Sequence, residues 1–178
     1  MRITTKKGDD GTTGLLFGGR TPKDGPRPIA YGEVDEAQAT LGVVRAQAGS
    51  ELADIVLGIQ RDLWVVMAEL ATGVEHAEKL TDGQNRTTAA MVEAIEATMA
   101  DVAERFDPPT EFVVPGEDPV AAALDVSRTV VRRAERAAVA AMRGQESQVV
   151  PYLNRLSDLL WTLARWQEGE SRTTRSVT

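Results

Sequence analysis

The sequence contains no cysteine and only one histidine, His76. Without thiols, neither disulfides nor thiolate metal sites can form, and one histidine excludes a centre built from several histidines. Aromatic residues make up only 4% of the chain, whereas alanine is abundant, which favours closely packed helices over a β-sandwich. No apolar run approaches the ~20 residues that a membrane-spanning helix needs, and the N-terminus lacks the apolar core of a signal peptide. We therefore expect a cytoplasmic protein with no membrane partner.

The remaining composition is that of an ordinary globular domain. The chain has 178 residues, 42% of them hydrophobic, and a net charge of −7. This length suits one domain with a substantial core, and the acidity argues against a nucleic-acid partner. We expect a single helical domain over 1–168, which includes an arm over 1–26, and a flexible C-terminal tail over 169–178.

Apolar residues recur at alternating three- and four-residue steps, the period of an amphipathic helix. Asp118 followed by Pro119 reads as an N-cap with proline at the first helical position. The pattern predicts an all-α fold, a ferritin-like five-helix antiparallel bundle with a glycine-rich N-terminal arm. The five helices are expected at about 28–49, 51–73, 84–105, 119–143 and 148–168.

Four arginines lie within nine residues of the fourth predicted helix. Arg128, Arg132 and Arg136 are spaced four apart, so they form one column of like charge that something must neutralise. Glu135 can neutralise at most one of the four, which include Arg133. Guanidinium groups bind phosphate or carboxylate in two parallel hydrogen bonds. The column is therefore either a solvated face or a site for a polyanion, or for carboxylates of another helix or subunit.

The segment 5–25 has the composition of a phosphate-binding loop. It holds six glycines and four threonines together with Lys6, Lys7, Arg20 and Lys23. Glycine permits close backbone approach and threonine adds hydroxyl donors. A P-loop is excluded because Arg20 stands where lysine belongs, no strand is predicted before it, and prolines prevent the following helix. An arm that is mobile alone and ordered by an anionic ligand fits this composition.

Several longer motifs are distributed over nearly the whole chain. They are G-D-D-G-T-T-G with G-G-R-x-x-K-D (8–24), Y-G-x-V-D-E (31–36), I-Q-R-D-L-W with A-E-L-A (59–71), E-F-V-V-P-G (111–116), R-T-V-V-R-R-A-E-R (128–136) and Y-L-N-R-L-S-D-L-L-W (152–161). Together, and in this order, they resemble one family, the PduO-type ATP:corrinoid adenosyltransferases.

The resemblance implies a homotrimer of five-helix bundles with active sites between neighbouring subunits. Such enzymes transfer the 5′-deoxyadenosyl group of ATP to cob(I)alamin, forming adenosylcobalamin and triphosphate, with Mg²⁺ accompanying the nucleotide. It assigns the triphosphate to Arg132 and Arg136, and places Glu135 near the metal or nucleotide. The residues it assigns to ATP are Thr5, Lys6, Gly8, Asp9, Gly11, Thr12, Thr13, Lys23, Arg132, Arg136 and Asn154.

For the corrinoid, the resemblance implies that bulky apolar side chains displace the lower cobalt ligand. Trp64, where the family has phenylalanine, and Trp161 are the candidates for this apolar wall. Asp35 and Arg128 match an aspartate–arginine pair that crosses the subunit interface. Asp125 departs from relatives that often carry histidine there, and it either caps the helix or reduces the basic field.

The chemistry is compatible with the missing nucleophiles, because cob(I)alamin itself attacks the 5′ carbon. Further partners implied are a corrinoid reductase and an adenosylcobalamin-dependent enzyme. Two alternatives of other classes stay open at this point. One is a protein that binds ATP or delivers adenosylcobalamin with little turnover, and the other is a structural helical oligomer with a basic seam.

Overall fold

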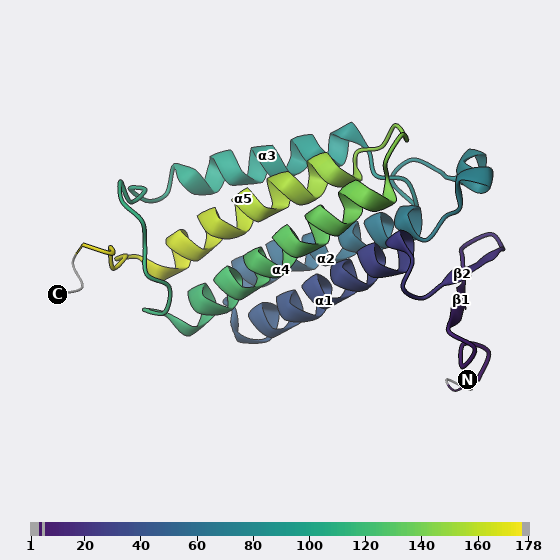
Figure 1. Ribbon diagram of the computed structural model, residues 1–178. Helices are drawn as coiled ribbons and strands as arrows, with labels where there is room; N and C mark the ends of the chain where they lie inside the picture. The colour runs from purple at the N-terminus through teal and green to yellow at the C-terminus, as the bar shows by residue number, and fades with distance from the viewer. Residues whose placement is uncertain (1–3, 5, 176–178) are drawn as a thin grey trace.

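The computed structural model of the protein describes residue 4 and residues 6–175, and within them it contains five α-helices. They are α1 (Pro26–Gln47), α2 (Ser50–Leu70), α3 (Ala89–Ala103), α4 (Pro119–Ala141) and α5 (Val149–Glu168). Figure 1 shows them as an antiparallel bundle, so the predicted five-helix fold is confirmed. No described helix combines the length and the apolar character that a membrane span requires.

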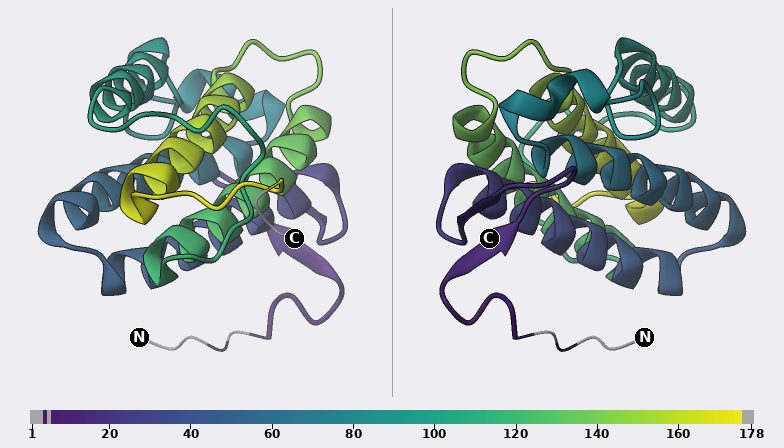
Figure 2. Two further views of the ribbon diagram at one scale, coloured as in Figure 1. Left: turned by 90° about the vertical axis from the view of Figure 1, so that its left-hand side faces the viewer. Right: turned by 90° about the vertical axis from the view of Figure 1, so that its right-hand side faces the viewer.

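Helix α4 lies at the centre of the packing. It contacts α1 on one side and α5 on the other, while α2 packs on α1 and α3 packs on α5. End-on views place α3 at the outside of the bundle (Figure 2). Leu41, Leu63, Leu124 and Leu160, from four different helices, are among the fully buried core residues. Burial of these stripes stabilises the bundle and fixes which face of α4 points outward.

Side-chain caps set two of the helix starts. The Asp118 carboxylate accepts hydrogen bonds from Val120 N and Ala121 N at 2.8 and 2.9 Å, as the sequence predicted for α4. Thr88 accepts from Met91 N and starts α3, five residues later than predicted. Helix α2 ends at Leu70 rather than at 73. A short 3₁₀ helix, η1 (Val74–Lys79), occupies the connection that follows.

The N-terminal arm contains a small hairpin. Strands β1 (Thr12–Gly14) and β2 (Arg20–Pro22) pair antiparallel, with Thr13 opposite Thr21. In the connection between the strands, Leu16 N donates to Ala71 O at 2.8 Å, which attaches the hairpin to the end of α2. Figure 1 shows the hairpin projecting beyond the end of the bundle, where α1 begins and α2 ends.

The segment after α5 lies against the connection between α3 and α4. Thr174 N donates to Phe112 O at 2.9 Å, and Val114 N donates to Arg172 O at 2.8 Å. The Arg172 side chain also pairs with Glu117 at 2.8 Å. The described part of the tail is therefore attached to the bundle by contacts that the sequence alone did not indicate.

Candidate functional site

The arginine column of α4 is partly neutralised within the chain. Arg132 donates to Glu135 Oε2, and the other oxygen of Glu135 accepts from Asn154 Nδ2 at 3.0 Å. Arg155 Nη1 donates to the amide oxygen of Asn154 at 2.7 Å. Three of the predicted site residues, Arg132, Glu135 and Asn154, are thus joined in one chain of hydrogen bonds across α4 and α5.

Arg133 and Arg136 differ sharply although they lie on the same helix. Arg133 pairs with Glu33 and Glu36 of α1, and hydrogen bonding, first to Glu36 and then to Glu33, raises the pKa of its guanidinium. Arg136 is exposed and donates to the backbone carbonyl of Arg132 at 3.1 Å. In the described part of the chain no carboxylate pairs with Arg136. It is therefore the member of the column best able to take an external anion.

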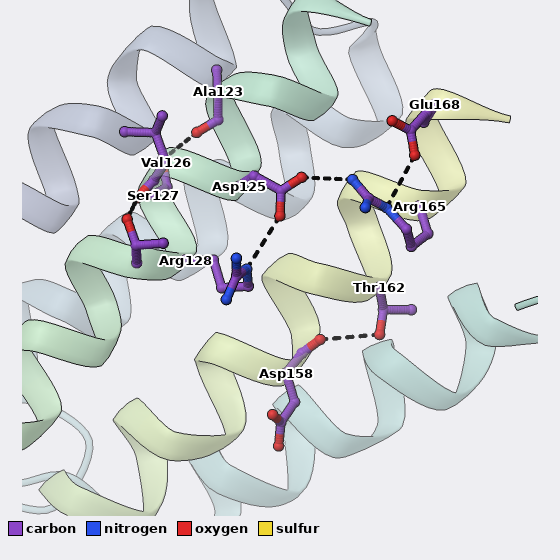
Figure 3. A network of polar contacts seen from close by, with 10 residues as sticks. Ala123, Asp125, Val126, Ser127, Arg128, Asp158, Thr162, Arg165 and Glu168 are labelled. Atoms are coloured by element: carbon purple, nitrogen blue, oxygen red, sulfur yellow. Dashed lines mark hydrogen bonds and ion pairs between the residues drawn. The ribbon is translucent and has the colours of Figure 1, made fainter. Parts of the chain in front are cut away.

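A second group surrounds Arg128. Its Nε lies 3.2 Å from Asp125 Oδ1, while Asp125 Oδ2 accepts from Arg165 Nη2 at 2.6 Å (Figure 3). Arg165 also approaches Glu168 at 3.2 Å. These residues border a cavity of about 600 Å³, the Arg128 cavity, whose lining includes Phe112, Asp125, Arg128, Trp161 and Arg165.

Another cavity opens between α1, α2 and the arm. This Trp64 cavity, of about 520 Å³, is lined mainly by apolar side chains with one carboxylate, Asp35. Its lining includes Leu16, Tyr31, Asp35, Trp64 and Met67. Trp64 is 66% exposed, an unusual environment for tryptophan. Trp64 and Trp161 thus line different cavities, and the chain forms no Asp35–Arg128 pair within the described residues.

Arg20 organises the arm hairpin. Its Nε donates to Thr12 Oγ1 at 2.9 Å and its Nη2 to Lys7 O at 2.7 Å. Asp10 accepts from Thr12 N, and this backbone hydrogen bond, with that of the Thr12 hydroxyl, lowers the pKa of its carboxyl. These contacts connect the strands to the preceding loop.

The other predicted arm residues surround this hairpin. A Cβ on Gly8 would lie 3.0 Å from Lys23 Nζ, so glycine lets this lysine approach the loop closely. Lys6, Asp9, Gly11 and Thr13 lie in the same arm. Thr5 lies outside the described residues.

Sequence reasoning missed two features of the site. Phe112 is 87% exposed and lines the same cavity as Arg128. The motif E-F-V-V-P-G, which contains it, does not by itself indicate a binding role for this side chain. An apolar side chain of this size at a cavity mouth is a binding signal that a sequence does not show. The pairing of Asp125 with Arg165 was also missed, because the two are 40 positions apart.

The described residues contain no cluster of three or more histidine, cysteine or acidic side chains able to hold a metal ion. Mg²⁺ is commonly held by one or two carboxylates together with substrate phosphates. Glu135, beside Arg132, fits that limited role, so its carboxylate is the candidate protein ligand.

Comparison with known proteins decides the family. The family described as cobalamin adenosyltransferase matches residues 3–167. The chain belongs to this family. The corrinoid adenosyltransferase of Mycobacterium tuberculosis is 37% identical over 187 residues, with 97% of this chain and 96% of the relative covered. The corrinoid adenosyltransferase of Citrobacter freundii is 38% identical over 170 residues, with 94% and 95% covered.

Solved structures agree with this membership of the cobalamin adenosyltransferase family. A variant PduO-type ATP:corrinoid adenosyltransferase of Lactobacillus reuteri, complexed with cobalamin and ATP, is similar with a TM-score of 0.88 and 30% identity. The match covers 98% of this chain and 97% of that chain. The predicted family, fold and enzyme class are therefore confirmed, whereas the roles assigned to single residues stay predictions.

Proposed function

We propose that this adenosyltransferase transfers the 5′-deoxyadenosyl group of ATP to cob(I)alamin at a site shared by two copies of the chain. The observation that carries the proposal is the division of the predicted residues between two cavities. Asp35 and Trp64 line one, while Arg128 and Trp161 line the other. Each cavity alone is within the range that encloses a drug-sized ligand, and a corrinoid is larger.

Contact between copies would bring the two cavities together. Asp35 has no charged partner in the described part of its own chain, and Arg128 is bound to Asp125 only through Nε. A neighbouring copy could therefore supply Asp35 to the terminal nitrogens of Arg128. Such a head-to-tail contact uses two different surfaces, and it closes into a ring such as the predicted homotrimer.

The chemistry requires the protein to position two substrates and stabilise a leaving group. The cob(I) centre attacks the 5′ carbon of ATP, a carbon–cobalt bond forms, and the bond from that carbon to the triphosphate oxygen breaks. Arg132 and Arg136 would hold the departing triphosphate, and the arm with Lys23 would close over it. Mg²⁺ beside Glu135 would supply further neutralisation of the phosphates.

The corrinoid would lie against apolar side chains from both sides. Trp161 and exposed Phe112 come from the Arg128 cavity, and Trp64 comes from the Trp64 cavity. These side chains would exclude water and a lower ligand from one face of the cobalt, which eases its reduction. Phe112 joins the two tryptophans predicted from sequence as a member of this wall.

The test is anaerobic turnover. Purified protein, ATP, Mg²⁺ and cob(I)alamin should yield adenosylcobalamin, seen by its cobalt–carbon absorbance, together with one triphosphate per product. Reactions without ATP give the baseline. A folded oligomer that binds ATP and corrinoid tightly but gives no product would instead favour the delivery role.

A further inference from the structure

Asp125 and Arg165 form a buried charged pair that the proposed mechanism does not use. The Arg165 side chain is 1% exposed, that of Asp125 is 7% exposed, and that of Glu168 is fully buried. With Arg128, these residues form a cluster of two positive and two negative charges. A buried ion pair is weak evidence for stability, because apolar residues of similar size often serve as well. The cluster therefore calls for an explanation beyond folding.

The two oxygens of Asp125 serve two different arginines. Oδ2 accepts from buried Arg165 at 2.6 Å, and Oδ1 accepts from Arg128 Nε at 3.2 Å. Arg165 holds the carboxylate from α5 and Arg128 holds it from α4, and all three residues line the Arg128 cavity (Figure 3). Arg165 thus holds Asp125 in place, and Asp125 in turn restrains Arg128.

The geometry of Arg128 follows from this arrangement. A guanidinium held through Nε keeps both terminal nitrogens available, and in the described residues neither has a hydrogen-bond partner. Arg128 is itself only one-third exposed, so its side chain lies in the cavity wall. A long side chain restrained at Nε loses less conformational freedom when it binds a carboxylate or a corrinoid amide.

We propose that Asp125, anchored by Arg165, is a positioning residue that orients Arg128 toward the corrinoid and the neighbouring copy. This rests on the proposed function for what Arg128 contacts. Asp125 itself does not touch a substrate. Its effect is to hold Arg128 in one orientation before the corrinoid arrives, so its removal affects corrinoid binding and not ATP binding.

Asp125→Asn is the sharpest variant. An amide offers one acceptor oxygen, so it can serve only one arginine, and buried Arg165 suffers more from an unpaired charge than Arg128 does. Arg128 should therefore lose its partner while the fold persists. The expected result is a roughly tenfold higher KM for cob(I)alamin, the scale of one charge-assisted hydrogen bond, with the KM for ATP unchanged.

Glu168→Gln is the matched control. It alters the same buried cluster through Arg165 but makes no contact with Arg128. Its KM for cob(I)alamin should stay at the wild-type value. In an Arg128→Ala background, Asp125→Asn should not further weaken equilibrium binding of the corrinoid, because the residue it positions is gone. Equal effects of Asp125→Asn and Glu168→Gln, or additive effects of Asp125→Asn and Arg128→Ala, would overturn the proposal.

An activity-free measurement separates this proposal from the proposed function. Hydrogen exchange of the arginine Nε–H groups, followed by NMR, should show protection of Arg128 in the wild type and its loss in Asp125→Asn. Retained protection in that variant overturns the positioning role, even if no turnover is found. If Asp125→Asn does not fold, the wild-type protein alone still tests the positioning role. An Arg128 Nε–H that exchanges as fast as the Nε–H of exposed Arg45 would overturn that role.

Discussion

The arginines of α4 are chemically alike, and their partners distinguish them. Arg136 lacks a carboxylate partner in the described residues, and Arg132 has Glu135, which is shared with Asn154. Arg132→Ala and Arg136→Ala should each lower kcat/KM about 100-fold, a loss of ~3 kcal/mol of transition-state stabilisation. Steady-state kinetics of adenosylcobalamin formation would measure this.

Arg133→Ala is the control for these variants, because its partners are Glu33 and Glu36 of the same chain. It should leave kcat/KM near the wild-type value and affect mainly thermal unfolding. If Arg133→Ala lowered kcat/KM as much as the other two, the loss would reflect the charge of the helix and not a triphosphate clamp.

A half-buried carboxyl on α2, that of Asp62, gives a pH-dependent prediction. Burial raises the pKa of Asp62, against the hydrogen bond that Tyr152 donates at 3.1 Å, which lowers it. Because the folded state then holds this proton more tightly than the unfolded chain, the group's contribution to the free energy of unfolding falls as pH rises through the raised pKa. Asp62→Asn should therefore raise Tm at pH 7 by a few degrees.

The gain from Asp62→Asn should shrink as the pH is lowered through the raised pKa of Asp62, because the native carboxyl then becomes protonated itself. Asp54→Asn, at an exposed position of the same helix, is the control and should change Tm little. A lower Tm for Asp62→Asn at pH 7 would mean that the Tyr152 hydrogen bond outweighs the cost of burying the charge.

At the scale of single residues, the sequence indicated which element carries a side chain better than it indicated what that side chain contacts. Spacing placed the arginine column correctly on α4, because a helix converts four-residue steps into one face. It could not separate Arg133 from Arg136, since Glu33 and Glu36 come from a helix about 100 positions away. The sequence also left two roles open for Asp125, because its partner Arg165 lies 40 positions away on another helix.

At the scale of elements, the arm hairpin offers a separate test. Arg20 joins Thr12, Lys7 and Asp10, all within the arm. Arg20→Ala should loosen β1 and β2 and raise the KM for ATP about tenfold, since the arm must then be ordered when ATP binds. Hydrogen exchange of the amides in 12–22 should accelerate, while the Tm of the bundle stays unchanged.

Arg45→Ala, an exposed arginine near the far end of α1, controls for the lost charge and should leave the KM for ATP unchanged. An Arg20→Ala variant with faster exchange but an unaltered KM for ATP would separate the hairpin from nucleotide binding and remove the arm from the proposed site.

The helices were predictable because local signals agreed with long-range packing. The Asp118–Pro119 start of α4 appeared at the predicted residue. The start of α3 was predicted wrongly because side chains there form hydrogen bonds with the backbone. Thr88 caps α3 and Arg86 donates to Ala77 O at 2.7 Å, so the residues before 89 form a turned connection instead of another helical turn. The hairpin depends on Arg20, and single-residue propensities do not contain that contact.

At the scale of the whole molecule, a shared site predicts complementation. Trp64→Ala and Arg128→Ala each damage one of the two cavities, so each variant alone should be nearly inactive in corrinoid transfer. Co-assembled in equal amounts, they should recover activity at about one quarter of the interfaces, those where each chain supplies its intact side. Activity of co-expressed, differently tagged chains would measure it.

The two variants mixed without subunit exchange are the control for complementation. No recovery after confirmed co-assembly would place the whole site within one chain. Size-exclusion chromatography with light scattering on the same samples would report whether the assembly is the predicted homotrimer.

The two ends of the bundle are both occupied by attached segments, the hairpin at one and residues 171–175 at the other. A purification tag or a surface tether attached to either of these segments would therefore sit beside a proposed substrate site. Helix α3 packs on α5, and its exposed Glu93 is not among the residues that line the Arg128 cavity or the Trp64 cavity. Because the sequence has no cysteine, Glu93→Cys would give one reactive thiol for a fluorophore or an immobilisation linker.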